Sequence, residues 1–479
     1  MNDPNGMVYL DGEYHLFYQH YPDSTVWGPM HWGHAVSPDL VHWEHLPIAL
    51  YPDSLGYIFS GSAVVDRQNT SGFGEVGQPP LIAVFTHHDP VGERAGRNDF
   101  QYQSIAYSLD KGRTWTKYAG NPVIPNTKAI RDFRDPKVIW DTARKEWLMV
   151  FAAKDRVQFW TSPDLKAWTF ASDFGDDYGT HAGVWECPDI FPIQVEGSSE
   201  QQWVLLSSIN PGGPNGGSAT QYFVGNWNGK RFTLDPTFAR DVRNERAVWL
   251  DYGRDNYAGV TWSDAPDDRR IFMGWMSNWD YAQVVPTKTW RSAMTLPRTL
   301  RLHRTDAGYR LCSEPVKELD RLRGASVAMS KRTLADTLDL RLQLSEALPL
   351  LEAELLIELP EQPTTFSVVL SNDAGDRYRI GYRSVDNAYF SDRRAAGDKR
   401  FSEKFAADVH VAPREARTKT VPLHLFFDVS SAELFSGAEV AVTDVFFPKQ
   451  PFDRVQLVVE GAPVQLLQAD FYPLESIWR

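Results

Sequence analysis

Short apolar runs, many of them alternating with polar residues, dominate residues 7–300 of the chain. They are interrupted about every 8 to 15 residues by glycine, proline, asparagine or aspartate, and hardly any segment has the period of an amphipathic helix. The clearest runs are 7–10, 14–18, 81–85, 147–151 and 203–206. A period of two between turn residues is typical of β-strands. The pattern therefore predicts an all-β fold.

A short turn motif occurs three times in this region, at 37–43, 108–115 and 162–168. Each copy begins with serine, has an aspartate two residues later and ends with tryptophan. Serine and aspartate side chains can close a turn, while the tryptophan packs at the base of the hairpin. Repeated hairpins of this kind predict the radial blades of a β-propeller. The spacings of 71 and 54 residues are irregular, so the repeats alone leave the number of blades open.

The character of the chain changes after residue 300. Residues 301–323 are charged and polar, and 314–319 predict a short helical linker, whereas alternating runs resume at 338–342, 353–357, 366–370 and 455–459. Regular strands joined by long polar segments are typical of a β-sandwich. We therefore expect a propeller over residues 1–300, a linker over 301–325 and a β-sandwich over 326–479. No chemical motif stands out in the sandwich, which indicates support or accessory binding.

Composition limits the partners of the chain. The formal charge of -13 argues against nucleic acid or an anionic membrane, which need clustered lysine and arginine, and it is compatible with a neutral substrate. No run of 18 apolar residues could span a membrane. The 17 tryptophans and 19 tyrosines suit stacking on sugars, although core packing explains most of them equally well. The compartment, secreted or cytoplasmic, and the oligomeric state stay open.

Cysteines and histidines predict neither a disulfide framework nor a metal site. The two cysteines, Cys187 and Cys312, are too few for such a framework. His31 and His34 could bind a metal, but two histidines three apart in a β-strand context favour a structural use. Other histidines lack further ligands at zinc-like spacing. We therefore expect no metal and no cofactor.

Three acidic residues stand at predicted ends of strands, each in a short motif that contains a proline. Asp3 lies in Asn-Asp-Pro-Asn-Gly (2–6), Asp135 in Phe-Arg-Asp-Pro (133–136), and Glu186 in Trp-Glu-Cys-Pro-Asp (185–189). Taken alone, the first is more typical of a hairpin turn and the second of a structural ion pair. Three such carboxylates in an all-β chain suggest cleavage of glycosidic bonds, which needs a proton donor and a second carboxylate. In a propeller the inner strands converge on one axis, so distant acids can meet.

With these motifs, together with Phe-Ser-Gly-Ser (59–62) and Tyr-Pro-Leu-Glu-Ser-Ile-Trp (472–478), the chain resembles the retaining glycoside hydrolases of the invertase, inulinase and levanase family, family 32 type. The resemblance covers nearly the whole chain and implies five blades followed by a sandwich. It implies that Asp3 is the nucleophile and Glu186 the general acid and then base. Asp135 is implied to be a stabiliser that binds fructose hydroxyls.

The resemblance also implies a set of residues that bind the terminal fructosyl unit: Asn2, Gln19, Trp27, Ser60, Arg134 and Asp135, with Phe59 and Trp279 as further aromatic candidates. Without the resemblance, core packing is the better interpretation of Trp27, Phe59 and Trp279. The chemistry needs Asp3 ionised and Glu186 protonated near the working pH. We expect Arg134 to hold Asp135 ionised, provided that the backbone bends at Pro136. Asp189 could contact the acceptor side or cap a turn.

The resulting hypothesis is an exo-acting β-fructosidase that releases fructose from levan, inulin or sucrose. One alternative is a fructosyltransferase with the same covalent fructosyl-enzyme, and another is a non-catalytic sugar-binding propeller. A sialidase-like enzyme is a third, because 108–115 fits the Asp-box pattern of those propellers. Sialidases need an arginine cluster and a tyrosine nucleophile, and the acidic motifs found here favour the fructosidase. The segments 278–279 and 290–297 are more similar to exo-inulinases and levanases than to plant invertases.

Overall fold

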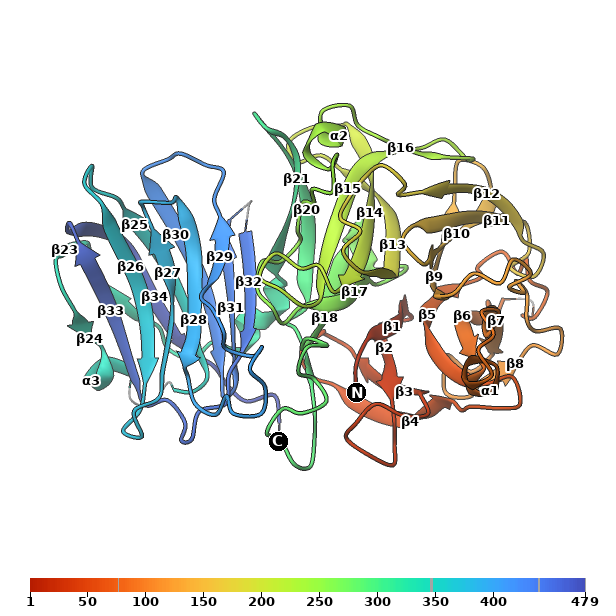
Figure 1. The fold of residues 1–479 in the computed structure, drawn as a ribbon, viewed down its shortest axis with the longest axis horizontal. Coiled ribbons are helices and arrows are strands. Elements are labelled where there is room, and N and C mark those ends of the chain that lie inside the picture. Colours follow the sequence, from red (N-terminus) through yellow and green to blue (C-terminus); the bar gives the residue numbers. More distant parts are fainter. Residues whose placement is uncertain (76, 345–347, 438–439, 479) are drawn as a thin grey trace.

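The computed structural model describes residues 1–75, 77–344, 348–437 and 440–478, and these residues form two β-rich bodies side by side (Figure 1). The N-terminal body consists of five sheets arranged around an axis, and the C-terminal body of two stacked sheets. The all-β prediction is confirmed. Within the described ranges, no helix is long and apolar enough to cross a membrane.

The five sheets of the N-terminal body follow one another along the chain, and their strands pair antiparallel in the order of the sequence. They are β1 (Pro4–Leu10), β2 (Glu13–His20), β3 (His31–Ser37) and β4 (Glu44–Leu50); β5 (Tyr57–Val65), β6 (Leu81–His88), β7 (Gln101–Ser108) and β8 (Thr116–Lys117); β9 (Phe133–Asp141), β10 (Glu146–Ala153), β11 (Val157–Ser162) and β12 (Thr169–Phe174); β13 (Val184–Gln194), β14 (Gln201–Asn210), β15 (Ala219–Trp227) and β16 (Phe232–Leu234); and β17 (Tyr257–Thr261), β18 (Ile271–Met276), β20 (Arg298–Thr305) and β21 (Gly308–Pro315), with β19 (Ala293–Met294) beside β18. Each sheet is one blade.

The first strands of the five blades form a closed ring. β1 contacts β5, β5 contacts β9, β9 contacts β13, β13 contacts β17, and β17 contacts β1. The last contact is reinforced where the Tyr9 N–H donates to the Ser263 carbonyl and the Ser263 N–H donates to the Met7 carbonyl, both at 2.9 Å. The ring confirms the five-bladed propeller.

The three serine–aspartate turns connect the third and fourth strands of the first three blades. In each turn the serine hydroxyl donates to the aspartate carboxylate, at 2.8–3.2 Å. The tryptophan indole N–H donates to the carbonyl three residues earlier, at 3.0–3.1 Å. The motif is therefore a recurring blade turn, as the sequence predicts.

A β-bulge interrupts every innermost strand at the same level of the ring. The extra residue lies between positions 5 and 8 of β1, 58 and 61 of β5, 134 and 137 of β9, 186 and 189 of β13, and 257 and 260 of β17. In four bulges one residue has a positive φ: Gly6 (+57°), Asp135 (+65°), Cys187 (+43°) and Ala258 (+52°). A bulge redirects the side chains that follow it. These bulges decide which side chains reach the centre of the propeller.

The C-terminal body is a β-sandwich, as predicted. One sheet has the order β22 (Val327–Met329), β34 (Val464–Pro473), β25 (Leu351–Glu358), β30 (Thr420–Asp428), β31 (Ser431–Ser436) and β32 (Val440–Val445), with β23 (Arg332–Leu334) also on β34; the other has the order β24 (Leu338–Asp339), β33 (Arg454–Gly461), β26 (Thr364–Ser371), β27 (Arg377–Arg383), β28 (Ala388–Ala395) and β29 (His410–Pro413). Leu355, Val368 and Leu423 belong to the core between the sheets. Helices are short: α1 (Pro90–Arg94), α2 (Phe238–Asp241), α3 (Arg341–Leu344) and 3₁₀ turns at Pro266–Asp268 and Lys317–Leu322.

Two segments differ from the sequence-based expectation. Residues 301–315, expected as linker, belong to β20 and β21, where Leu302 and Leu311 pack into the core of the fourth and fifth blades. Arg301 and Arg304 on β20 are exposed, which disguises this strand in the sequence. The run 338–342, expected as a strand, turns into α3 after β24, and the Asp339 carboxylate accepts from the Arg341 N–H at 2.8 Å.

Buried charges join the propeller to the sandwich. The side chain of Arg298 is fully buried and donates to Asp251 (2.8 Å) from the propeller and to Glu433 (2.6 Å) from the sandwich. It also donates to the Thr443 hydroxyl at 2.6 Å. Gly253 lies so close to the Thr443 backbone that a Cβ there would come within about 2 Å of it. The two domains therefore share one closely packed interface.

We expect Arg298→Met to lower the free energy of unfolding by about 3–5 kcal/mol, because Asp251 and Glu433 would stay buried without their cation. Arg400→Met is the matched control: that side chain is 89% exposed in its pair with Asp398, and the expected change is within about 0.5 kcal/mol. Guanidinium denaturation of both variants tests this. Equal midpoints would contradict a structural role for the buried charges.

Candidate active site

The structure brings the three predicted acids together around Cys187. The Cys187 sulfur lies 3.7 Å from Oδ2 of Asp3 and 3.6 Å from Oδ2 of Asp135. The Cys187 N–H donates to the same Asp135 oxygen at 3.0 Å. Glu186 precedes Cys187 on β13, and its charge acts on both aspartates. Residues from β13, β9 and the start of β1 thus meet at the ring of bulges.

Glu186 is held on both carboxylate oxygens. Nη2 of Arg134 donates to Oε1 at 2.8 Å, and the Tyr257 hydroxyl donates to Oε2. Nη1 of Arg134 also donates to Asp132 at 2.6 Å. Arg134, Glu186 and Tyr257 are each the last paired residue before the bulge of their strand, in three consecutive blades. The fivefold architecture therefore places the three side chains within reach of one another.

The expected backbone bend next to Pro136 is present. Asp135 has a φ of +65° within the bulge, and its N–H donates to the Thr86 hydroxyl at 3.0 Å. Neighbours on a regular strand point to opposite faces, but here Nε of Arg134 lies 3.7 Å from Oδ2 of Asp135. The bulge thus allows both side chains to reach one site.

Burial dominates the ionisation of the two aspartates. It raises the pKa of Asp135 to about 7, against the opposing charge of Arg134. The expectation that Arg134 keeps Asp135 ionised is therefore wrong for the free protein near neutral pH: desolvation and the neighbouring carboxylates outweigh one guanidinium. Burial also raises the pKa of Asp3, whereas hydrogen bonds from Asn2 and Ser60 lower it. Protonation belongs to the cluster as a whole.

Asp3 is fixed by its neighbours at the start of β1. The Asn2 side-chain amide donates to Oδ1 at 2.9 Å, and the Ser60 hydroxyl donates to Oδ2 at 2.8 Å. The Gln19 N–H donates to the Asp3 carbonyl at 3.0 Å. The Gln19 side chain is buried, and among the described residues its Nε2 has no acceptor. Asn2 and Ser60 thus hold the carboxylate through their side chains, and Gln19 contacts the Asp3 backbone.

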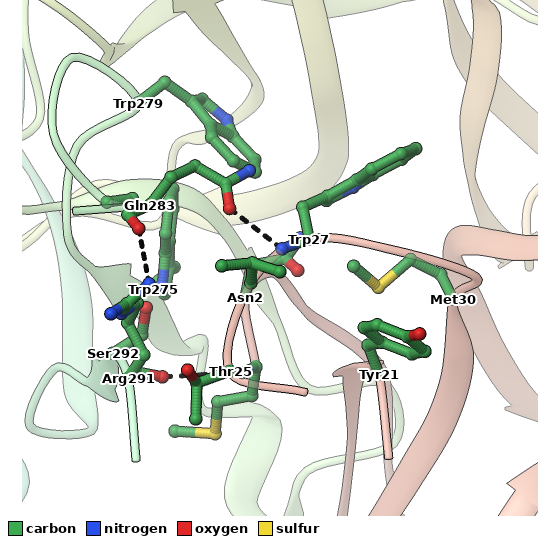
Figure 2. A pocket seen from close by; sticks show the side chains of 13 residues that line it. Asn2, Tyr21, Thr25, Trp27, Met30, Trp275, Trp279, Gln283, Arg291 and Ser292 are labelled. Atoms are coloured by element: carbon green, nitrogen blue, oxygen red, sulfur yellow. Dashed lines mark hydrogen bonds between the residues drawn. The ribbon is translucent and has the colours of Figure 1, made fainter. Parts of the chain in front are cut away.

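An aromatic recess opens beside Asn2 (Figure 2). Trp27 and Trp279 line it from opposite sides, and the Trp27 N–H donates to Oε1 of Gln283 across it at 2.9 Å. The Phe59 ring contacts Trp27 edge-on, with centroids 6.0 Å apart, and stacks on His88. A second recess is lined by residues that include Ser60, Asp135 and Cys187. Asn2 thus belongs both to the aromatic recess and to the contacts of Asp3, whereas Ser60 lines the second recess together with Asp135.

Tyr257, Cys187 and Gln101 are site residues that the sequence reasoning did not assign. Oε1 of Gln101 accepts from Nη1 of Arg134 at 3.3 Å. Burial raises the pKa of the Cys187 thiol well above its usual value, so the thiol stays neutral beside the carboxylates. Tyr257 occupies the same position in its blade as Arg134 and Glu186 occupy in theirs. This equivalence could have identified Tyr257, but only once the limits of each blade were known.

Other candidate residues have structural roles. Asp189 is fully buried, 3.3 Å from Nζ of Lys137, and accepts from the Thr261 hydroxyl at 2.7 Å. His34 is buried with its Nε2 at 3.0 Å from Nδ1 of His15. Within the described part of the chain, one group of side chains is close enough to hold a metal ion: Glu352, Glu354 and His424 in the sandwich. Arg323 already pairs with both of those glutamates, at 2.5 Å.

Comparisons with known proteins agree with this geometry. Levanase of Bacillus subtilis (strain 168) is 45% identical over 484 residues, covering 100% of this chain and 69% of the levanase. Extracellular exo-inulinase of Aspergillus awamori is 37% identical, covering 100% of this chain and 93% of the relative. The crystal structure of exo-inulinase from Aspergillus awamori has a TM-score of 0.90 at 35% identity, covering 100% and 96% of the two chains.

A complex with a sugar is among the similar structures. The fructofuranosidase from Schwanniomyces occidentalis complexed with fructose has a TM-score of 0.84 at 30% identity, covering 99% of this chain and 96% of that one. Two family models match: the glycosyl hydrolases family 32 N-terminal domain over residues 1–315 and the glycosyl hydrolases family 32 C-terminal domain over 318–473. The chain belongs to glycosyl hydrolase family 32.

Proposed function

We propose that the protein is an exo-acting, retaining β-fructosidase that removes terminal fructosyl units from fructans such as levan and inulin, and from sucrose. The observation that carries this proposal is the meeting of Asp3, Asp135 and Glu186 around Cys187, beside a recess with tryptophan walls. Family membership and the similarity to levanase and exo-inulinase support it.

The proposed reaction has two steps. Asp3 attacks the anomeric carbon of the terminal fructose while Glu186 donates a proton to the departing oxygen, which leaves a covalent fructosyl-enzyme. Glu186 then takes a proton from a water molecule, whose oxygen attacks the same carbon and releases Asp3. Asp135 binds the fructose hydroxyls as positive charge develops on the sugar ring.

The contacts of the acids suit these roles. Hydrogen bonds from Asn2 and Ser60 favour the ionised form of Asp3, which is the form a nucleophile needs. Arg134 and Tyr257 fix the orientation of Glu186 and stabilise the carboxylate that remains after it has given up its proton. The same two groups leave the carboxyl ready to act as a base in the second step.

The terminal fructosyl unit is proposed to occupy the space between the acids and the aromatic recess. Trp27, Phe59 and Trp279 offer faces for the C–H groups of a sugar. Asn2 and Ser60 offer hydrogen bonds, and Gln19 offers the amide that has no acceptor in the described structure. The catalytic unit in this proposal is the propeller, with the sandwich attached to its fifth blade.

The experiment that tests the activity is incubation of the protein with levan, inulin, sucrose and raffinose, with products resolved over time. Exo-hydrolysis predicts free fructose as the small product released first from the two fructans, and oligosaccharides should not accumulate. A ladder of oligosaccharides at early times would instead mean endo-cleavage or transfer to a sugar acceptor, and would contradict the proposal.

We expect Glu186→Gln to lower turnover by about 10²–10⁴-fold, because the amide cannot deliver a proton. Asp3→Asn should lower it by about 10⁴-fold or more, since it removes the nucleophile. Glu361→Gln is the control, because Glu361 lies 76% exposed in the sandwich, and its turnover should be unchanged. Initial rates with sucrose test the set. Near-normal turnover in either active-site variant would remove its assigned role.

The role of Asp3 can be tested separately by the pH dependence of kcat/KM in a Ser60 variant. Its hydrogen bond lowers the pKa of Asp3, so Ser60→Ala should raise that pKa further. Because Asp3 must be ionised to react, the acid limb of kcat/KM should move to higher pH. Ser62→Ala, two residues along β5, is the control; its hydroxyl accepts from the Val138 N–H and does not contact Asp3. An acid limb that stays in place, or moves equally in both variants, would contradict Asp3 as the ionising group.

A further inference from the structure

One loop of the propeller lies between the aromatic recess and the sandwich. This recess loop, residues 277–285, follows β18 and carries Trp279, Ala282 and Gln283, which line the recess (Figure 2). The Trp279 ring packs on Trp275 with centroids 4.8 Å apart. The rest of the propeller also holds the loop, because the side-chain amide of Asn278 donates to the Arg254 carbonyl at 2.8 Å. The loop is thus a wall of the proposed sugar site.

The sandwich contacts the other side of the same loop. Tyr281 and Val285 form a buried cluster with Phe405 and Val445, and Phe401 packs against it. The Phe405 ring meets Tyr281 at a right angle, with centroids 5.0 Å apart. Trp279, Ala282 and Gln283 therefore face the recess, whereas Tyr281 and Val285 face the sandwich.

Buried polar contacts strengthen this attachment at Tyr281. Its hydroxyl donates to Asp255 at 2.5 Å and accepts from Nη2 of Arg393, a sandwich residue, at 2.8 Å. The same guanidinium donates to the Phe405 carbonyl at 2.8 Å and lies 4.0 Å from the Phe405 ring centroid. Arg393 and Asp255 are both fully buried side chains. Buried residues of the sandwich thus fix the middle of the recess loop at Tyr281.

A second attachment lies directly beside Trp279. The Asp280 carboxylate accepts from Nζ of Lys404 at 2.7 Å and from Nη2 of Arg254 at 2.6 Å. Arg254 also donates to the Lys404 carbonyl, so the propeller and the sandwich hold Asp280 together. Two neighbouring residues of the loop, 280 and 281, are therefore bound to one sandwich segment, residues 401–406.

We propose that the sandwich segment 401–406 positions the tryptophan wall of the sugar site, with Phe405 and Lys404 as positioning residues. The proposal rests on the proposed function. Because Asp3, Asp135 and Glu186 are placed by β1, β9 and β13, release of the recess loop leaves the acids in place. It therefore weakens sugar binding and spares the chemical step. The sandwich is in this sense part of the binding site and more than a support.

The test is Phe405→Ala, compared with Phe452→Ala. Phe452 is equally buried in the sandwich core but does not contact the recess loop. With sucrose, Phe405→Ala should raise KM about three- to tenfold, which is the change in affinity expected from the loss of one aromatic contact. Its kcat per folded molecule should stay within about threefold of the wild type, because the acids do not move. Phe452→Ala should leave KM unchanged, since a loss of stability alone lowers the folded fraction and not the affinity.

A milder pair of variants decides the matter if Phe405→Ala does not fold. Lys404 is 67% exposed, so Lys404→Met costs little stability and should raise KM about twofold, with Lys404→Arg restoring it. An unchanged KM in Phe405→Ala or, failing that, in Lys404→Met would overturn the positioning role. So would an equal rise in Phe452→Ala.

The proposed function is tested separately by the wild-type protein. Failure of the wild type to release fructose from sucrose counts against the function. Fructose titrated by tryptophan fluorescence into the same variants then supplies the affinities, with weaker binding expected in Phe405→Ala, a smaller loss in Lys404→Met, and no change in Phe452→Ala. If the wild type is active and the variants bind equally well, the positioning role alone fails.

Discussion

The closed ring of five inner strands, each broken by a bulge at the same level, is the constraint on which the site depends. Regular strands would alternate their side chains and send neighbouring polar groups to opposite faces. Positive φ values at Asp135, Cys187 and Ala258 cost about 1–3 kcal/mol each. Hydroxyls of adjacent strands accept from two of these bulged N–H groups, Thr86 for Asp135 and Ser208 for Ala258, and so offset part of the cost.

The ring also concentrates charge in a place where water is scarce. Burial raises the pKa of Asp135 to about 7. The guanidinium of Arg134 donates hydrogen bonds to Glu186 and Asp132. A neutral thiol at Cys187 fills the space between two carboxylates without adding a third anion. Burial of the two aspartates therefore shifts their ionisation toward higher pH.

Much of the fold could be predicted from the sequence, because a period of two and recurring turn residues report local structure directly. The three acids could be found because each lies in a short motif that contains a proline. Tyr257 could not be found in this way, since its role depends on a contact with Glu186 between two neighbouring blades. The ionisation of Asp135 was predicted wrongly for a related reason: sequence shows its neighbour Arg134 but not its burial. The alternation of Leu338, Leu340 and Leu342 with polar residues predicts a strand throughout, but after β24 the chain turns into α3.

In the proposed mechanism Asp3 and Glu186 act on opposite sides of one fructosyl unit, so the central claim concerns stereochemistry. The most direct measurement is the anomeric form of the fructose released in the first moments of hydrolysis, followed by NMR before mutarotation. Double displacement through Asp3 predicts β-fructofuranose as the first product. The α-anomer appearing first would mean a single displacement by water, and would contradict a covalent fructosyl-enzyme at Asp3.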